Sequence, residues 1–404
     1  KGMLSSLHGS AGAITALQNS VAHYYQRASS ADYLGVDPTR RSLTGTGGYV
    51  KVGRKGNAKW NFSETFTWSS PGFDLNDMGY MKETDYLMNE TEIMYRQTDI
   101  WKIFRYNAFT LSQKNMWNYG GTPFSNNGSL RWQSMTMNRY EWDVKETFAW
   151  NWLDSRLLRG GPDVRFGSYF LTSAKFNTDK AKRMMFMLKY EGDHNFEGNR
   201  FNTISPSLTF RLGNHVYLSG QLDYAWNTDE MQYVATTSPL SSSSLAPYYY
   251  VMGHMDQKTY GLTLKLQVNV TPDISIQFYG APFTSIAKYD DFKLAADTKS
   301  HTFENRFQRI DPDQLTYADG VYTIGEGAGQ MPFRNPDFRF NEFRSNLVAR
   351  WEYLPGSTLY FVWEHRMSNR DNWYSSGWGS NLDRMWGLPA TNTFMIKMNY
   401  WFNL

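Results

Sequence analysis

Residues 262–283, LTLKLQVNVTPDISIQFYGAPF, decide the fold class of this chain. Apolar and polar side chains alternate from Leu262 to Val270, and after Thr-Pro-Asp the alternation resumes from Ile274 to Phe278. This period of two residues predicts two strands joined by a tight turn. In a soluble sandwich the apolar face would pack on a core, whereas in an outer-membrane barrel it would face lipid and the polar face would line the lumen. The hairpin alone is compatible with both folds.

Composition narrows the choice. The chain has 404 residues, 17% of them aromatic, with 41 basic and 38 acidic side chains and no cysteine. The balanced charge offers no basic face for nucleic acid. No apolar run approaches the roughly 20 residues that a spanning helix needs, which excludes a helical membrane protein. The lack of cysteine excludes disulfides and thiolate metal sites.

The last fourteen residues, TNTFMIKMNYWFNL (391–404), carry the strongest single indication. Their apolar side chains fall on one face of a strand: Phe394, Ile396, Met398, Tyr400, Phe402 and Leu404. This segment resembles the terminal strand by which bacterial outer-membrane barrels are recognised during assembly. The alternative is a soluble edge strand, which would expose an aggregation-prone apolar edge.

A barrel requires short turns at one rim and long loops at the other, and the sequence predicts this alternation. We expect descending strands at 45–53, 84–97, 127–138, 165–177, 200–212, 256–270, 343–354 and 392–404. We expect ascending strands at 58–69, 104–117, 141–153, 182–193, 215–228, 273–284 and 357–368. Long loops are then expected near 70–83, 118–126, 154–164, 194–199, 229–255, 285–342 and 369–391.

Fifteen strands that end downward imply an earlier ascending strand, because single-chain bacterial barrels usually have an even number. Residues 2–8 fit the end of that strand, which gives at least 16 strands. Because the chain lacks an initiating Met, we expect residues 1–404 to be the C-terminal part of a single transmembrane β-barrel. Its first strand would be incomplete, and further barrel would lie upstream or on another chain.

Aromatic residues lie where a bilayer interface would favour them. One face of the strand expected at 58–69 carries Trp60, Phe62, Phe66 and Trp68, as expected for aromatic girdles. Glu64 lies on that same face, which a lipid-facing assignment does not predict. Either a bulge shifts the register there, or this face meets protein.

Three long segments carry a family resemblance: 23–45 (HYYQRASSADYLGVDPTRRSLTG), 69–85 (SSPGFDLNDMGYMKETD) and 335–363 (NPDFRFNEFRSNLVARWEYLPGSTLYFVW). With 255–283 they resemble the outer-membrane proteins of Bacteroidota grouped as domain of unknown function 5916. The resemblance implies a barrel in the bacterial outer membrane. Family members usually carry an upstream domain similar to family-nine carbohydrate-binding modules, which residues 1–404 do not include. The resemblance supplies no catalytic residues.

Motifs for catalysis and metal binding are weak. The seven histidines form no HExxH and no pair at i, i+4, and there is no GxSxG elbow or phosphate loop. Asp193-His194 and Glu364-His365 lie near the expected outer rim, but adjacent residues on a strand point to opposite faces. The acidic segment 311–320 lacks the spacing of an EF-hand, so a solvated loop is favoured over a calcium site. We therefore predict no catalytic residue, metal or cofactor.

Aromatic loop tips are the candidate contact residues for a ligand or partner. They lie in 246–254 and 369–387, next to Asn, Asp and Arg: Tyr248, Tyr249, Tyr250, Trp373, Tyr374, Trp378 and Trp386. Flat rings beside polar groups suit glycan binding, and the alternative is that they pack the long loops together. The loop 285–342 is too long for a simple connection, so we expect it to fold into the lumen or over the mouth.

The leading hypothesis is an outer-membrane channel for a nutrient such as an oligosaccharide or peptide. One alternative is a structural or accessory subunit of a larger outer-membrane assembly, and another is a membrane anchor for an upstream carbohydrate-binding or hydrolytic domain. We expect short periplasmic turns, long extracellular loops and a periplasmic C-terminus. The expected partners are outer-membrane lipid, lipopolysaccharide, other outer-membrane proteins or lipoproteins and a glycan ligand, but no nucleic acid.

Overall fold

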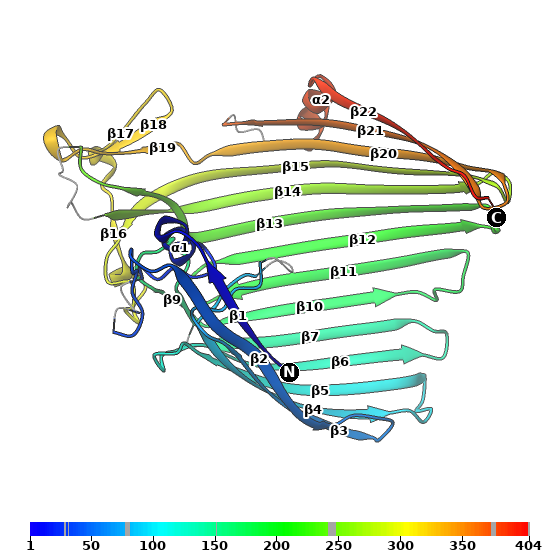
Figure 1. The fold of residues 1–404 in the computed structure, drawn as a ribbon, viewed down its shortest axis with the longest axis horizontal. Coiled ribbons are helices and arrows are strands. Elements are labelled where there is room, and N and C mark those ends of the chain that lie inside the picture. Colours follow the sequence, from blue (N-terminus) through cyan, green and yellow to red (C-terminus); the bar gives the residue numbers. More distant parts are fainter. Residues whose placement is uncertain are drawn as a thin grey trace.

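A computed structural model describes residues 1–27, 30, 32–76, 81–150, 152–240, 248–372 and 377–402. It is nearly all antiparallel β, and one 17-stranded sheet dominates it (Figure 1). The short strand β16 (Phe307–Arg309) pairs with the end of β15. The other strands of this sheet are β1 (Gly2–His8), β2 (Ser42–Arg54), β3 (Trp60–Ser69), β4 (Tyr86–Gln97), β5 (Phe104–Trp117), β6 (Pro123–Thr136), β7 (Glu141–Trp150), β10 (Tyr169–Asn177), β11 (Met184–Asn195), β12 (Arg200–Leu212), β13 (Val216–Thr237), β14 (Tyr249–Asn269), β15 (Ile274–Ala295), β20 (Phe338–Leu354), β21 (Ser357–Asp371) and β22 (Ala390–Asn399).

The hairpin of β14 and β15 forms as its alternation predicts. Leu266 lies opposite Phe278, and Val268 lies opposite Ile276. The Thr271 hydroxyl accepts a hydrogen bond from the Ile274 amide at 3.0 Å, which satisfies a backbone donor in the tight turn. The apolar side chains of both strands therefore share one face of the sheet.

All fifteen predicted strands are present, and residues 2–8 form the predicted additional strand, β1. The connections also alternate as predicted. Short turns gather at one end of the sheet, to the right in Figure 1, and the longer segments gather at the other. The strand β22 runs toward the short-turn rim, where the chain ends its described part.

Two predicted loops are partly wrong. The ranges 229–255 and 285–342 are largely strand, because β13 extends to Thr237, β14 begins at Tyr249 and β15 extends to Ala295. Protein covers both faces of these extensions, so their sequences lose the apolar-polar alternation. Register shifts between Asp229 and Gln232 and between Met252 and His254 interrupt the pattern further.

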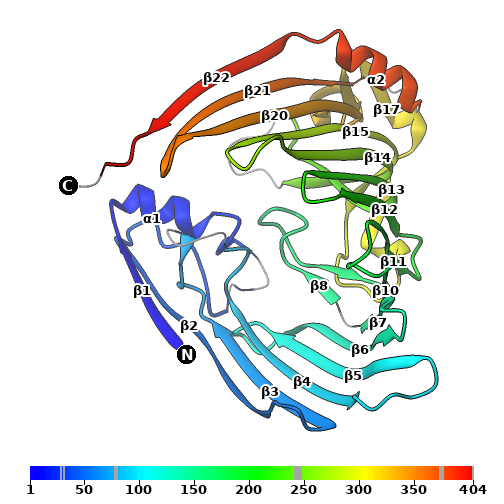
Figure 2. The same cartoon turned by 90° about the vertical axis from the view of Figure 1, so that its right-hand side faces the viewer.

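In the part of the chain that the structure describes, the sheet curves strongly but does not close. Figure 2 shows a C-shaped cross-section, with β1 and β22 as its two edges. Among the described residues β1 pairs with β2 and β22 pairs with β21, and no pairing joins β22 to β1.

The two faces of the sheet differ in chemistry. On the convex face, β13 and β14 present exposed apolar residues such as Leu218 and Leu264, up to a stacked aromatic group of Tyr224, Trp226 and Tyr260. We call this band of apolar and aromatic residues the convex belt. The concave face of the same strands carries polar residues.

The concave side near β1 and β2 holds the helix α1 (Ala11–Gln18) and the segment that follows it (Figure 2). Its small core joins Ile14, Tyr25 and Leu43. The Asp85 carboxylate accepts hydrogen bonds from Arg27 at 2.7 Å and from the Tyr33 hydroxyl at 2.6 Å. This packing fills one sector of the space that the sheet surrounds.

Two further cores lie at the long-loop rim, on either side of the extended strands β13 to β15. The first lies between these strands and the insertion that contains β8 (Trp152–Asp154) and β9 (Val164–Phe166). The second lies under a three-stranded sheet of β17 (Leu315–Ala318), β18 (Val321–Ile324) and β19 (Met331–Arg334). The connection 296–337 also contains the single turns η3 (Glu304–Arg306), η4 (Pro312–Gln314) and η5 (Gly327–Gly329).

The helix α2 (Trp378–Trp386) packs against β15, β20 and β21. It buries Arg339, which donates hydrogen bonds to Asp371 and Asn381. Neither helix in the described part of the chain is long and apolar enough to cross a membrane.

Candidate functional site

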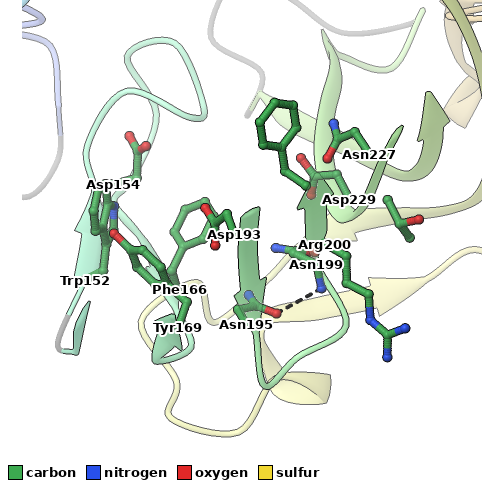
Figure 3. A pocket seen from close by; sticks show the side chains of 12 residues that line it. Trp152, Asp154, Phe166, Tyr169, Asp193, Asn195, Asn199, Arg200, Asn227 and Asp229 are labelled. Carbon is green, nitrogen blue, oxygen red and sulfur yellow. Dashed lines mark hydrogen bonds between the residues drawn. The ribbon is translucent and has the colours of Figure 1, made fainter. Parts of the chain in front are cut away.

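The candidate site is a pocket at the long-loop rim, where the β8–β9 insertion covers the concave face of β10 to β13 (Figure 3). Its volume is about 230 Å³, and we call it the rim pocket. It is lined by Trp152, Asp154, Phe166, Tyr169, Asp193, Asn195, Asn199, Arg200, Phe201, Asn227, Thr228 and Asp229. Because sites for drug-sized ligands measure about 300–1,000 Å³, this pocket fits a single ring-sized group.

Aromatic rings form one wall of the rim pocket. The Trp152 ring meets the Tyr169 ring edge to face, with centroids 5.3 Å apart, and lies 6.4 Å from the Phe166 ring. Pairing of β8 with β9 places Trp152 opposite Phe166, so the insertion itself builds this wall. Rings held in this way offer a rigid apolar surface to a flat ligand.

Polar groups form the other wall. Strand pairing places Asp193 and Asn227 on the two sides of Phe201, so all three lie at one level of the concave face. Asp229 follows two residues after Asn227 and points to the same side. The pocket therefore sets carboxylates and an amide opposite aromatic rings.

Burial changes the pKa of the titratable side chains that line the rim pocket. The pocket lies beyond the aromatic end of the convex belt. Burial raises the pKa of the Asp193 carboxyl; His194 opposes the shift and the Asp229 charge adds to it. Burial also raises the pKa of Asp229, against the hydrogen bond that its carboxylate accepts from the Met231 amide. The Tyr169 hydroxyl has a pKa raised by burial and by the Asp193 charge, so it stays a neutral donor.

Some lining side chains are already used to hold the surrounding loop. The Asn195 side-chain oxygen accepts hydrogen bonds from the amides of Glu197 and Asn199, both at 2.9 Å. The Asn199 side-chain oxygen accepts one from the Glu230 amide at 2.7 Å. By contrast, the Asp193 carboxylate accepts no hydrogen bond from the described residues, so it has free capacity for a ligand.

A buried ion pair fastens the rim connection next to the pocket. Arg306 is 1% exposed and donates to both carboxylate oxygens of Glu197, at 2.9 and 2.7 Å. It also donates to the carbonyls of Ser300 and Arg165, at 2.7 and 2.8 Å. Glu197 additionally accepts from the Gly167 amide at 2.8 Å. These contacts tie residues 300–306 to the segment that enters β10.

The rim pocket adjoins a larger cavity on the concave face, of about 580 Å³. Asp193 and Phe201 line both spaces. The larger cavity carries side chains of both charge signs, among them Glu90, Lys114 and Lys145. A polar path thus leads from the long-loop rim along the inner wall of the sheet.

This arrangement suits a polar solute with flat apolar faces. The rings can cover such a face while Asp193 and Asn227 bond to hydroxyl or amide groups. In the described residues no group of three or more His, Asp or Glu side chains is arranged to hold a metal ion.

The sequence-predicted aromatic side chains that the structure describes do not gather into one site. Tyr249 and Tyr250 pack against the two rim cores, which matches the packing alternative, while Tyr248 is 70% exposed. Trp386 is exposed and lies 4.9 Å from the Phe343 ring, beside the convex face. The remaining candidates cannot be placed in this way: only the backbone of Trp378 is described, in α2, and Trp373 and Tyr374 lie outside the described residues.

The acid-histidine pairs lie as the strand rule predicts. Asp193 faces the rim pocket, whereas His194 bonds to Asn202 at 2.8 Å on the convex face. His365 bonds to Asn392 at 2.9 Å. In the acidic segment 311–320, the Asp311 side chain caps the single turn η4.

Sequence reasoning missed the rim pocket. The sequence pattern pairs Asp193 only with His194, its neighbour in sequence, whereas the residues that line the pocket with Asp193 come from the insertion and from β13. The useful signal was a concentration of aromatic residues around the predicted loop 154–164, at Trp150, Trp152, Phe166 and Tyr169.

A family model described as domain of unknown function 5916 matches residues 9–404. This match confirms the resemblance seen in the sequence. No curated protein matches the chain, and no solved structure matches it.

Proposed function

The chain belongs to the family described as domain of unknown function 5916, and we propose that it forms the wall of an outer-membrane β-barrel that carries a small polar solute across the bacterial outer membrane. The solute class that suits the rim pocket is an oligosaccharide or a peptide. The observation that carries this proposal is the polar path from the rim pocket into the adjoining cavity through Asp193 and Phe201.

The dimensions of the convex belt support a membrane location. On β13 the belt runs from Val216 to Trp226, ten residues further along the strand. At about 3.4 Å per residue this is about 34 Å, and a strand tilt of about 40° gives a height of about 26 Å, close to the roughly 25 Å apolar band of outer-membrane barrels. On the neighbouring strand, Lys258 lies opposite Trp226 at the upper end of the belt, and Asp256 lies opposite Thr228, two residues further toward the long-loop rim. Charged residues therefore begin where the belt ends.

The unequal rims support an orientation. Short turns suit the periplasmic side, and the rim with the two cores suits the extracellular side. The C-terminus would then be periplasmic, and lipid and lipopolysaccharide would surround the belt. Solute would meet the rim pocket before it enters the lumen.

Single-channel recording tests the proposal on the natural full-length protein. Reconstituted in planar bilayers, it should conduct in discrete steps, and maltohexaose or a tetrapeptide should block the current. An ionised hydrogen-bonding partner contributes about 1.5–3 kcal/mol, so Asp193→Asn should weaken the block about tenfold or more. Asp99→Asn is the matched control, because its ion pair with Lys59 is exposed at the opposite rim. Correctly folded protein that does not conduct would refute transport.

An assembly role is the second candidate. It is favoured by one specific observation, a carboxylate in the middle of the convex face of β3 and another on β7, from which the next inference starts.

A further inference from the structure

Two strands carry the same nine-residue pattern. β3 contains WNFSETFTW (60–68), and β7 contains WDVKETFAW (142–150). Each has a Trp at both ends and Glu-Thr-Phe from its centre. Because strand side chains alternate, the first residue of each pattern and every second residue after it share one face. In β3 these residues are Trp60, Phe62, Glu64, Phe66 and Trp68, and in β7 they are Trp142, Val144, Glu146, Phe148 and Trp150.

That face is the convex one, and the central residue on it is charged. Glu64 lies four residues from Trp60 and four from Trp68, and Glu146 lies four residues from Trp142 and four from Trp150. The pairings of β3 with β2 and β4, and of β7 with β6 and β10, contain no register shift. A bulge therefore does not explain why Glu64 shares a face with aromatic residues.

Both carboxylates have the same kind of neighbour. Glu64 accepts a hydrogen bond from the Thr91 hydroxyl at 2.6 Å and another from the Asn89 side chain. Glu146 accepts one from the Thr172 hydroxyl at 2.7 Å. Within the described residues neither carboxylate forms an ion pair with a Lys or Arg side chain.

A polar stripe runs from Glu64 across the next strands, but it ends before Glu146, whose neighbour on β6 is the exposed Leu130. Gln113 on β5 lies opposite Thr91, and Asn115 lies opposite Asn126 on β6. Aromatic residues bound the stripe on both sides, for example Phe109 and Trp117 on β5. The corresponding face of β14 is apolar throughout, with Leu262, Leu264, Leu266 and Val268.

A carboxylate facing hydrocarbon at mid-belt is strongly unfavourable, and such residues in membranes usually meet protein or water. Here the pattern places one on each of two strands, β3 and β7. The convex positions of β3 to β7 between their aromatic ends include no Lys or Arg. A second copy joined through this face would thus bring more carboxylates and no cation.

We infer that the convex face of β3 to β7 binds a different membrane-embedded protein, one that presents Lys or Arg side chains to Glu64 and Glu146 near the middle of the bilayer. Two carboxylates with hydroxyl and amide neighbours match such cations in charge and in hydrogen bonding. The inference rests on the proposed membrane location and not on transport.

Photocrosslinking in native membranes tests it first. A photoreactive phenylalanine analogue at Phe66 and, separately, at Phe148 should each crosslink to the same protein, at a segment containing Lys or Arg. The same analogue at Leu264 is the control and should yield no such adduct. Adducts with lipid alone, or with a second copy of this chain, would overturn the inference.

Charge removal tests it second. The double variant Glu64→Leu, Glu146→Leu should reach the outer membrane and keep its resistance to unfolding in SDS, while the co-purified amount of the crosslinked protein falls at least tenfold. Glu92→Gln, on the concave face of β4, should retain that protein. Replacing the partner's crosslinked cation by Glu should abolish binding, and Glu64→Lys should restore it.

The outcomes separate the two proposals. Unchanged partner recovery in the double variant, or failure of the charge exchange, overturns this inference and leaves the membrane location standing. A chain absent from the outer membrane overturns both. If the double variant does not fold, the crosslinks at Phe66 and Phe148 in otherwise unchanged protein still show whether a cationic partner protein binds this face.

Discussion

The ion pair between Arg306 and Glu197 should control how tightly the rim connection is held, and Glu197→Gln tests this. The substitution keeps the size of the side chain and one acceptor, but it removes the charge that balances Arg306. Arg306 is 1% exposed and the Glu197 side chain is 13% exposed, so water can do little to replace the lost partner. Because the arginine stays buried with its charge, the change acts on the folded state of residues 296–306.

The expected magnitude follows from this burial. Removal of one partner from a buried ion pair costs about 3–5 kcal/mol. The lower end applies here, since Gln can still accept one hydrogen bond and Arg306 keeps its bonds to the Ser300 and Arg165 carbonyls. A cost of about 3 kcal/mol corresponds to an increase of about 100-fold in the local opening equilibrium.

Native-state hydrogen exchange measures that equilibrium. Two backbone amides report on the opening of residues 296–306. The Arg165 amide donates to the Thr298 carbonyl at 2.9 Å, and the Ala296 amide donates to the Arg306 carbonyl at 2.8 Å. Both should exchange about 100-fold faster in Glu197→Gln, while amides in the middle of β12 stay unchanged. The matched control is Arg309→Gln, because the Arg309 side chain is 80% exposed and pairs with Asp291 at only 3.8 Å.

An exposed pair of this kind contributes about 0–1 kcal/mol, so the control should change exchange less than about fivefold. The double variant Arg306→Leu, Glu197→Leu should be less damaging than the sum of its single changes, since it leaves no unpaired buried charge. Equal exchange rates in Glu197→Gln and the parent protein would refute the reasoning.

Two further predictions concern the segment on the concave side. Burial lowers the pKa of His23, against the charge of Asp74 4.0 Å away; the unfolded segment therefore binds more protons below about pH 6.5, and its stability should be full above that pH and fall as the pH decreases. Proteolysis of residues 19–41 should accelerate from pH 8 to pH 5, and His23→Gln should remove this dependence; a pH dependence that survives the substitution contradicts the assignment. A Cβ on Gly45 would lie 2.1 Å from the backbone nitrogen of Phe73, whereas one on Gly12 in α1 would meet nothing within 4 Å. Gly45→Ala should thus lower the Tm through overpacking of about 1–3 kcal/mol, and Gly12→Ala should raise it through a helix propensity gain of about 1 kcal/mol; shifts of the same sign would contradict this account.

The extent to which the fold was predictable depends on what each strand faces. Where one face is apolar and the other polar, as in residues 262–278, the period of two residues locates the strand and its turn within a few positions. Where protein packs on both faces, as at Met231 and Val251, no alternation survives, and the sequence pattern therefore predicts loops in place of the strand extensions. Of the aromatic residues predicted as ligand contacts, Tyr249 and Tyr250 pack against these cores.

The sequence by itself determined the all-β class, the strand order and which side chains share a face. These features depend on local periodicity and on turns between neighbours in the chain, which a linear pattern records. It also marked Glu64 as inconsistent with a lipid-facing strand. Only the tertiary structure excluded a β-bulge at Glu64. It also showed that Asp193 lines a pocket with residues of an insertion about 40 residues earlier in the chain, and that Arg306 forms an ion pair with Glu197. Those contacts depend on how the sheet curves and on where long connections return to it, and neither is encoded in a local period.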